Sequence, residues 1–86
     1  MAMIRARISI LPKRTVFDPQ GETVRHALGH FGLAPVERVR VGKEIELEFP
    51  ADTDPSAIRS RLEAVARDFL SNPVVEEFEL HFEGLP

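Results

Sequence analysis

The 86-residue sequence contains no cysteine. A disulfide framework and a thiolate zinc site are therefore both excluded. A domain of this size buries only roughly 60–65% of the surface that its unfolded chain exposes, so a single copy is only marginally stable. Because disulfides are absent, association with further subunits is the common remedy for such a small chain. Residues 1–86 contain no linker or low-complexity stretch, and we predict one domain.

Long hydrophobic runs and a surplus of positive charge are absent as well. The apolar run Met1–Leu11 is short and is interrupted by Arg5 and Arg7, so it is neither a secretory signal nor a membrane span. The formal net charge of −3 argues against a nucleic-acid-binding protein, which usually presents a basic face. These absences predict a soluble cytoplasmic protein with no membrane and no nucleic-acid partner.

Catalytic motifs are also missing. The serines and histidines form no nucleophile–base motif, and no glycine-rich dinucleotide fingerprint occurs. Gly42-Lys43 resembles the end of a phosphate-binding loop, but the earlier glycine is missing, Glu44 replaces Ser or Thr, and no helix is expected to follow. We therefore predict no catalytic residue and no cofactor site in this chain.

Regular hydrophobic spacing, in contrast, is present along most of the chain. Strict alternation predicts half-buried strands near residues 4–10, 39–49 and 77–83. Spacing of three and four residues predicts two amphipathic helices, the first ending at Gly32 and the second before Asn72-Pro73. Their apolar stripes are Val24, Ala27, Leu28 and Phe31 in the first helix, and Ile58, Leu62, Val65, Ala66, Phe69 and Leu70 in the second.

The two halves of the chain share one order, which is strand, Asp-Pro, amphipathic helix and strand. Asp18-Pro19 begins the first helix and Asp54-Pro55 begins the second. This order predicts an α+β fold of ferredoxin-like character, with the two helices on one face of an antiparallel sheet.

Residues 36–49 leave two arrangements open. The apolar residues share one parity, so a two-residue hairpin at Gly42-Lys43 would mix apolar and charged side chains on one face. A β-hairpin with a three-residue loop at 42–44 avoids this, and so does one long strand bent or bulged at Gly42. As one strand the segment would span roughly 45 Å at ~3.3 Å per residue, which is longer than such a small domain. We favour the long strand, with the sheet shared in a dimer.

The stretch FDPQGETVRHAL, residues 17–28, contains two unusual positions. Asp18 fits the N-cap and Pro19 the first position of a helix, so the Asp18 carboxylate takes the place that a phosphate would need. Gly21 lies inside the helix, where glycine costs about 1 kcal/mol relative to alanine. Either Gly21 is a tolerated glycine or close packing site within one chain, or it permits close approach of a partner.

Three polar side chains and one lysine have two interpretations each. Glu22, His26 and His30 are spaced so that they share one helical face and are able to converge on zinc, but no fourth ligand is evident. We favour a solvated face and predict no metal. Lys43 either extends its stem along the sheet edge, which we favour, or points into an interface.

The carboxylates Glu77, Glu79 and Glu83 form one face of the last strand. Such a face is able to bind a cation or a basic partner. More often it is solvated, or it pairs with Arg5 and Arg7 if the first strand lies alongside.

Three stretches, VFDPQGETV, RVRVGKEIEL and NPVVEEFEL, occur in an order and spacing that resembles the PurS family, the small subunit of phosphoribosylformylglycinamidine synthase. The resemblance covers essentially the whole chain. It departs at residues 67–71, where the sequence is RDFLS and members of the family often have a cysteine and Leu-Leu-Ala.

The resemblance implies a role in purine biosynthesis. The complex converts formylglycinamide ribonucleotide, glutamine and ATP to formylglycinamidine ribonucleotide. A synthetase subunit binds ATP and magnesium, and a glutaminase subunit releases ammonia. The small subunit has no active site; as a homodimer or homotetramer it bridges the other two and supports ammonia transfer.

Six residues are predicted to lie at subunit interfaces on this basis: Asp18, Gly21, Arg40, Gly42, Lys43 and Asn72. The alternative is a ferredoxin-like dimeric small-molecule sensor domain. The carboxylates of Asp18 and Asp54 count against it, because they occupy the free N–H groups at both helix starts.

Overall fold

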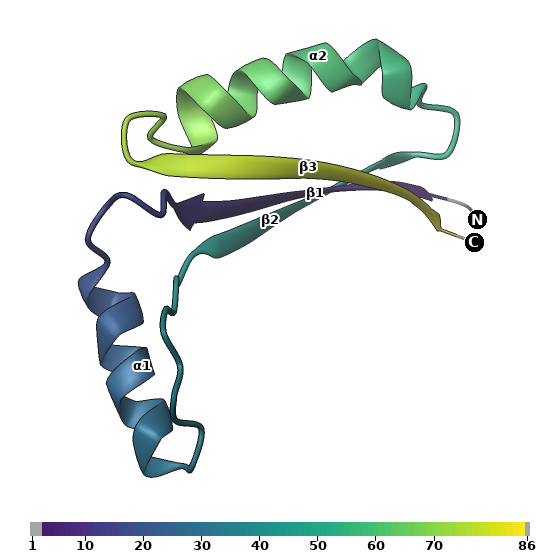
Figure 1. Ribbon diagram of the computed structural model, residues 1–86. Helices are drawn as coiled ribbons and strands as arrows, with labels where there is room; N and C mark the ends of the chain where they lie inside the picture. Colours follow the sequence, from purple (N-terminus) through teal and green to yellow (C-terminus); the bar gives the residue numbers. More distant parts are fainter. Residues whose placement is uncertain (1–2, 86) are drawn as a thin grey trace.

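Three strands and two helices make up the fold (Figure 1). The structure is a computed structural model that describes residues 3–85; residues 1, 2 and 86 of the predicted domain lie outside the described residues. In chain order the elements are β1 (Met3–Pro12), α1 (Pro19–His30), β2 (Lys43–Pro50), α2 (Pro55–Val65), the five-residue π-helical turn η1 (Ala66–Leu70) and β3 (Glu76–Leu85).

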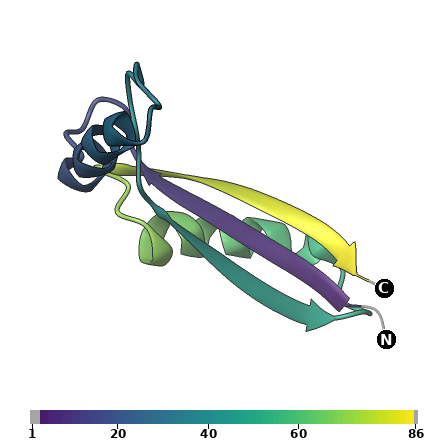
Figure 2. The same cartoon turned by 90° about the horizontal axis from the view of Figure 1, so that it is seen from below.

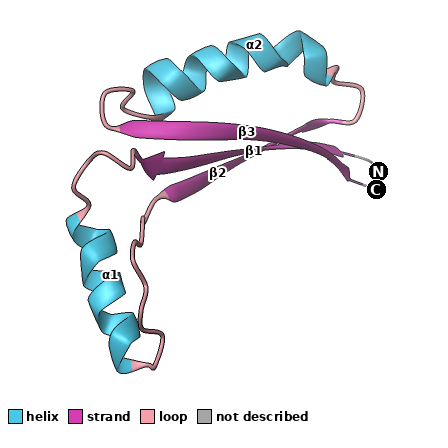
Figure 3. Cartoon of the chain, viewed as in Figure 1, coloured by secondary structure: helices cyan, strands magenta, loops and turns pink. Residues whose placement is uncertain are grey.

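The sheet is antiparallel in the order β2-β1-β3, so β1 is its central strand (Figure 3). Ile8 lies opposite Ile45 of β2 and Leu80 of β3, which brings the apolar residues of all three strands to one face. α2 covers this face and contributes Leu62 and Ala66 to a core around Ile8 and Ile10. The predicted α+β fold with an antiparallel sheet is therefore confirmed.

The position of α1 differs from the prediction that both helices share one face of the sheet. In this chain α1 lies beyond the end of the sheet and points away from it (Figures 1 and 2). The Cα radius of gyration is 16.4 Å, against about 12 Å for a compact domain of this length. We call residues 33–42 the return segment, and α1 together with the return segment the arm.

The return segment accounts for the position of α1. It runs back along α1 and continues into β2 without reversing direction (Figure 1). The predicted hairpin at 42–44 is therefore wrong for this chain. The direction agrees with the long strand, but pairing with β1 begins only at Lys43, opposite Ile10. Because the chain does not turn back at Gly42, α1 cannot fold over the sheet of its own chain.

The ends of the helices follow the sequence closely. Gly32 has a φ of 81° and ends α1, and the Leu33 N–H donates to the Leu28 carbonyl at 3.1 Å, which closes a Schellman motif. α2 ends in η1, where the Ser71 N–H donates to the Ala66 carbonyl at 3.0 Å. This wider turn changes the helical register, so Phe69, predicted in the apolar stripe, is 80% exposed.

Candidate functional site

The base of the arm brings together most of the residues that the sequence singled out. Asp18 accepts hydrogen bonds from the Gly21 N–H, which caps α1, and from the Val41 N–H of the return segment, both at 3.0 Å. The Val41 bond, followed by the Gly21 bond, lowers the pKa of Asp18 below its usual value. Asp18 therefore caps the helix, as predicted, and also ties it to the return segment.

Gly21 and Gly42 allow two backbone segments to approach closely. A Cβ atom at Gly21 would lie 2.1 Å from the Val39 carbonyl oxygen, and one at Gly42 would lie 1.9 Å from the Ile10 carbonyl oxygen. Both distances are too short for any side chain. The structure thus shows close packing within one chain at Gly21. A role of either glycine between subunits stays a prediction.

Two arginines hold the return segment against the end of the sheet. Arg40 donates to the Pro12 carbonyl at 3.2 Å and forms an ion pair with Glu77 of β3. Arg38 donates to the Arg14 carbonyl. These bonds join residues more than 20 positions apart and give the arm a fixed root.

Lys43 and Asn72 lie outside this cluster of hydrogen bonds. Lys43 is the exposed first residue of β2, as expected for a lysine at the sheet edge. Asn72 shapes the turn before β3: its carbonyl accepts from the Glu76 N–H at 2.7 Å, and its side-chain oxygen accepts from the Val74 N–H at 3.1 Å. The interface roles predicted for both residues stay predictions.

The face of the sheet opposite α2 is charged. Arg7 Nε lies 2.9 Å from Glu83 of β3, and Arg5 lies within 3.8 Å of Glu46, Glu48 and Glu83. The predicted pairing of the first strand with the carboxylates of the last is confirmed. Such half-exposed pairs contribute little to stability, and they set the register of the strands more than they hold the sheet together.

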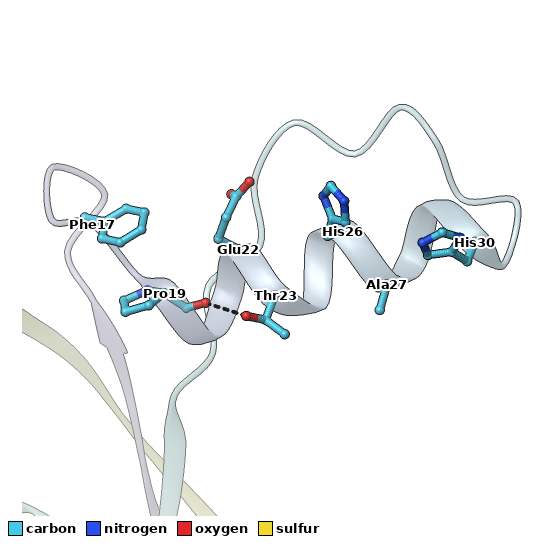
Figure 4. Close-up of a pocket in the computed structure, with 7 residues that line it drawn as sticks. All are labelled: Phe17, Pro19, Glu22, Thr23, His26, Ala27 and His30. Carbon is cyan, nitrogen blue, oxygen red and sulfur yellow. Dashed lines mark hydrogen bonds between the residues drawn. The ribbon is translucent and has the colours of Figure 1, made fainter.

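The residues considered for a metal line one side of α1 (Figure 4). The rings of His26 and His30 are 6.3 Å apart. Glu22 is bound by Arg25 through Nε at 3.0 and 3.1 Å, and this hydrogen bond lowers the pKa of Glu22. Within residues 3–85 no three His, Cys, Asp or Glu side chains meet in a way that could hold a metal ion.

A shallow groove of about 620 Å³ runs along the same side of α1. It is lined by Phe17, Pro19, Glu22, Thr23, His26, Ala27 and His30 (Figure 4). The sequence reasoning missed the groove and its aromatic wall, Phe17, which is 77% exposed. A phenylalanine in an otherwise polar loop was the signal that could have pointed to it.

Apolar residues on the arm and on the sheet are incompletely covered. On the arm, Val24, Phe31 and Leu33 are exposed, and Phe31 is 81% exposed. On the sheet, Ile45, Leu47 and Phe49 of β2 stay half-buried next to α2. Exposed apolar patches of this kind mark contact surfaces.

The remaining findings limit other kinds of site. Asp54 accepts a hydrogen bond from the Ser56 N–H at 3.0 Å, so both helix N-termini hold a carboxylate and neither favours a bound anion. No helix in residues 3–85 has the length and apolar character to cross a bilayer.

Known proteins resemble this chain along nearly its whole length. A family model described as "PurS: Phosphoribosylformylglycinamidine (FGAM) synthase" matches residues 5–84. Phosphoribosylformylglycinamidine synthase subunit PurS of Mycobacterium leprae is 33% identical over 82 residues, which cover 95% of this chain and 99% of that one. The corresponding subunit of Thermotoga maritima is 34% identical over 80 residues, covering 93% and 96%.

Solved structures agree. PurS of Thermus thermophilus matches with a TM-score of 0.78 and 38% identity, covering 98% of this chain and 99% of that one. A chain in the structure of PurLQS from Thermotoga maritima matches with a TM-score of 0.76 and 32% identity, covering 96% and 100%.

Proposed function

The chain belongs to the PurS family of phosphoribosylformylglycinamidine synthase subunits, and we propose that it bridges the synthetase and glutaminase subunits of this enzyme and supports ammonia transfer between them. It is a subunit of a ligase of purine biosynthesis. Its own part in the reaction is non-catalytic. ATP and magnesium belong to the synthetase subunit, no cofactor is bound by this chain, and the complex works in the cytoplasm.

The arm is the observation that carries this proposal. A fixed root of hydrogen bonds holds α1 away from its own sheet, with Val24 and Phe31 uncovered. A helix that is kept outside the core of its own chain buries its apolar face only against another chain. This architecture suits a subunit whose task is to join others.

The smallest assembly that we propose is a homodimer in which two copies exchange their arms. The arm of one copy would lay its return segment beside β2 of the other and place α1 over Ile45, Leu47 and Phe49. The pairing is the one a hairpin at 42–44 would make within one chain, so exchange requires only that the loop stays straight. Arg38 would then face glutamates of the second β2, which sets the register of the pair.

Reconstitution tests the bridging role. Adding the purified chain to the synthetase and glutaminase subunits is expected to restore glutamine-dependent synthesis of formylglycinamidine ribonucleotide. Ammonium salt in place of glutamine is the control, because free ammonia needs no transfer between subunits. Full glutamine-dependent activity of the two large subunits without this chain would show that the proposal is wrong.

A further inference from the structure

α1 presents two separate uncovered sides. Pro19, Thr23, His26 and His30 follow one another at intervals of four, three and four residues, so they share one side of the helix. Val24 and Phe31 belong to another side, and Gly21 packs on the return segment at a third. Exchange of arms between two copies would cover the side of Val24 and Phe31. The groove beside Thr23 would remain free for a different partner.

The floor of this groove is apolar and its wall is aromatic. Phe17 and Pro19 lie at the N-terminal end of α1 and His30 lies toward the C-terminal end, with Thr23 and Ala27 between them (Figure 4). The Thr23 hydroxyl donates to the Pro19 carbonyl at 3.0 Å, which leaves its methyl group to the groove. A surface of this shape accepts apolar side chains from another protein.

The polar groups left free in the groove are hydrogen-bond donors. Glu22 is occupied by Arg25, so the groove's own carboxylate is already paired. The structure shows no hydrogen bond from any described residue to His26 or His30. Residues 33–36 of the return segment, which also line the space beside the two histidines, carry no charge. Imidazole N–H groups, next to the cationic Arg25, are complementary to a carboxylate.

We propose that this groove is the docking site for another subunit of the synthase, which inserts an apolar side chain next to an Asp or Glu side chain that His26 and His30 bind. The inference rests on the proposed assembly role. It adds the surface, and it adds the chemistry of the partner. Two imidazoles without a third ligand do not hold a metal, and a basic partner would meet Arg25 and the histidines with like charge.

Binding of the intact chain to the purified synthetase subunit and to the purified glutaminase subunit tests this inference. Thr23→Arg fills the groove with a long side chain that helices tolerate well. We expect it to weaken binding to one of the two subunits by tenfold or more. Ser60→Arg, which adds the same side chain to the exposed side of α2, is the matched control and should leave affinity unchanged.

Substitutions of the histidines distinguish an acidic partner from a merely apolar one. The double variant His26→Glu/His30→Glu should bind more weakly than His26→Gln/His30→Gln, because it adds repulsion to the loss of the donors. His26→Arg/His30→Arg should keep most of the affinity. The Gln pair changes side-chain volume little, so it decides the question if Thr23→Arg perturbs folding.

The outcomes separate this inference from the proposed function. If the unaltered chain binds neither subunit, both fail. If the unaltered chain binds and restores activity, but Thr23→Arg and the Glu pair bind as well as it does, only the groove is wrong. Tighter binding by the Glu pair would also overturn the inference, since it would mean a basic partner.

Discussion

The two helices of this chain begin alike and end in different surroundings. Each starts with Asp-Pro and has its aspartate as the N-cap, and they are similar in length, at 12 residues for α1 and 11 for α2. Yet α2 buries Leu62 against the sheet, and the buried residue of α1 is Gly21, against the return segment. Capping and spacing therefore decide that a helix forms. The connection that follows it decides what the helix packs on.

The connections differ in direction. After α2, η1 and the turn around Asn72 reverse the chain, so β3 returns beside β1 beneath the helix (Figure 1). After α1, the return segment runs straight into β2 and leaves the helix outside. The following four predictions test this comparison between a helix packed within its own chain and one held for another chain.

The largest effect is expected beneath α2. Ile8→Ala removes a fully buried side chain from the core between the sheet and α2. We expect the free energy of unfolding, measured by urea denaturation, to fall by about 2–5 kcal/mol. Val74→Ala, at an exposed apolar residue, is the control and should change it by less than about 0.5 kcal/mol. Equal effects of the two substitutions would contradict the position of the core.

The counterpart on α1 is Phe31→Ala. Phe31 is exposed within one chain, so we expect little change in the stability of a single copy. If Phe31 is buried by a second copy, its loss removes about 1.5–3 kcal/mol, or roughly a tenfold to hundredfold of dimer affinity. Sedimentation equilibrium measures this. An unchanged dissociation constant would speak against exchange of arms through this side of α1.

Two glycines of α1 offer a matched pair of smaller effects. Gly21→Ala places a Cβ 2.1 Å from the Val39 carbonyl oxygen, so the return segment must move. We expect a cost of about 1–3 kcal/mol. Gly29→Ala meets nothing within 4 Å and should stabilise the helix by about 0.5–1 kcal/mol. Thermal unfolding followed by circular dichroism compares them, and stabilisation by both would contradict the close packing at Gly21.

The smallest effect concerns pH. Hydrogen bonds from Val41 and Gly21 lower the pKa of Asp18 from its usual value of 3.8. A carboxylate with a lowered pKa in the folded state stabilises it above the usual value, and this stabilisation is lost as the pH falls through the folded-state pKa. Exchange protection of the Val41 amide should therefore decrease below about pH 4. Asp18→Asn should remove most of this pH dependence.

Asp54→Asn is the control for that measurement. The pKa of Asp54 is also lowered, chiefly by the Ser56 hydroxyl and then by the Ser56 N–H, but Asp54 does not contact the return segment. The Val41 amide should behave as in the unaltered chain. If Val41 keeps the same protection at every pH in Asp18→Asn, then Asp18 does not hold the arm.

Part of the candidate site was predictable from sequence. Asp18-Pro19 and Asp54-Pro55 begin the two helices as predicted, and Gly32 ends the first. The parity of Arg5 and Arg7 against Glu83 is also as predicted. The second hydrogen bond of Asp18, to Val41, was not predictable, because it joins residues 23 positions apart. The exposure of Phe69 depends on η1, which the apolar spacing did not indicate.

By itself the sequence determined the identity of the strands and helices, the face that each strand buries, and the family. These features depend on contacts between residues a few positions apart or on matching stretches along the chain. The tertiary structure alone decided that α1 stands away from the sheet and that Gly21 and Gly42 pack against carbonyl oxygens of distant segments. The physical reason is that the direction of the chain at Gly42 is set by contacts with Ile10 and, through Val41, with Asp18. No local pattern contains those contacts.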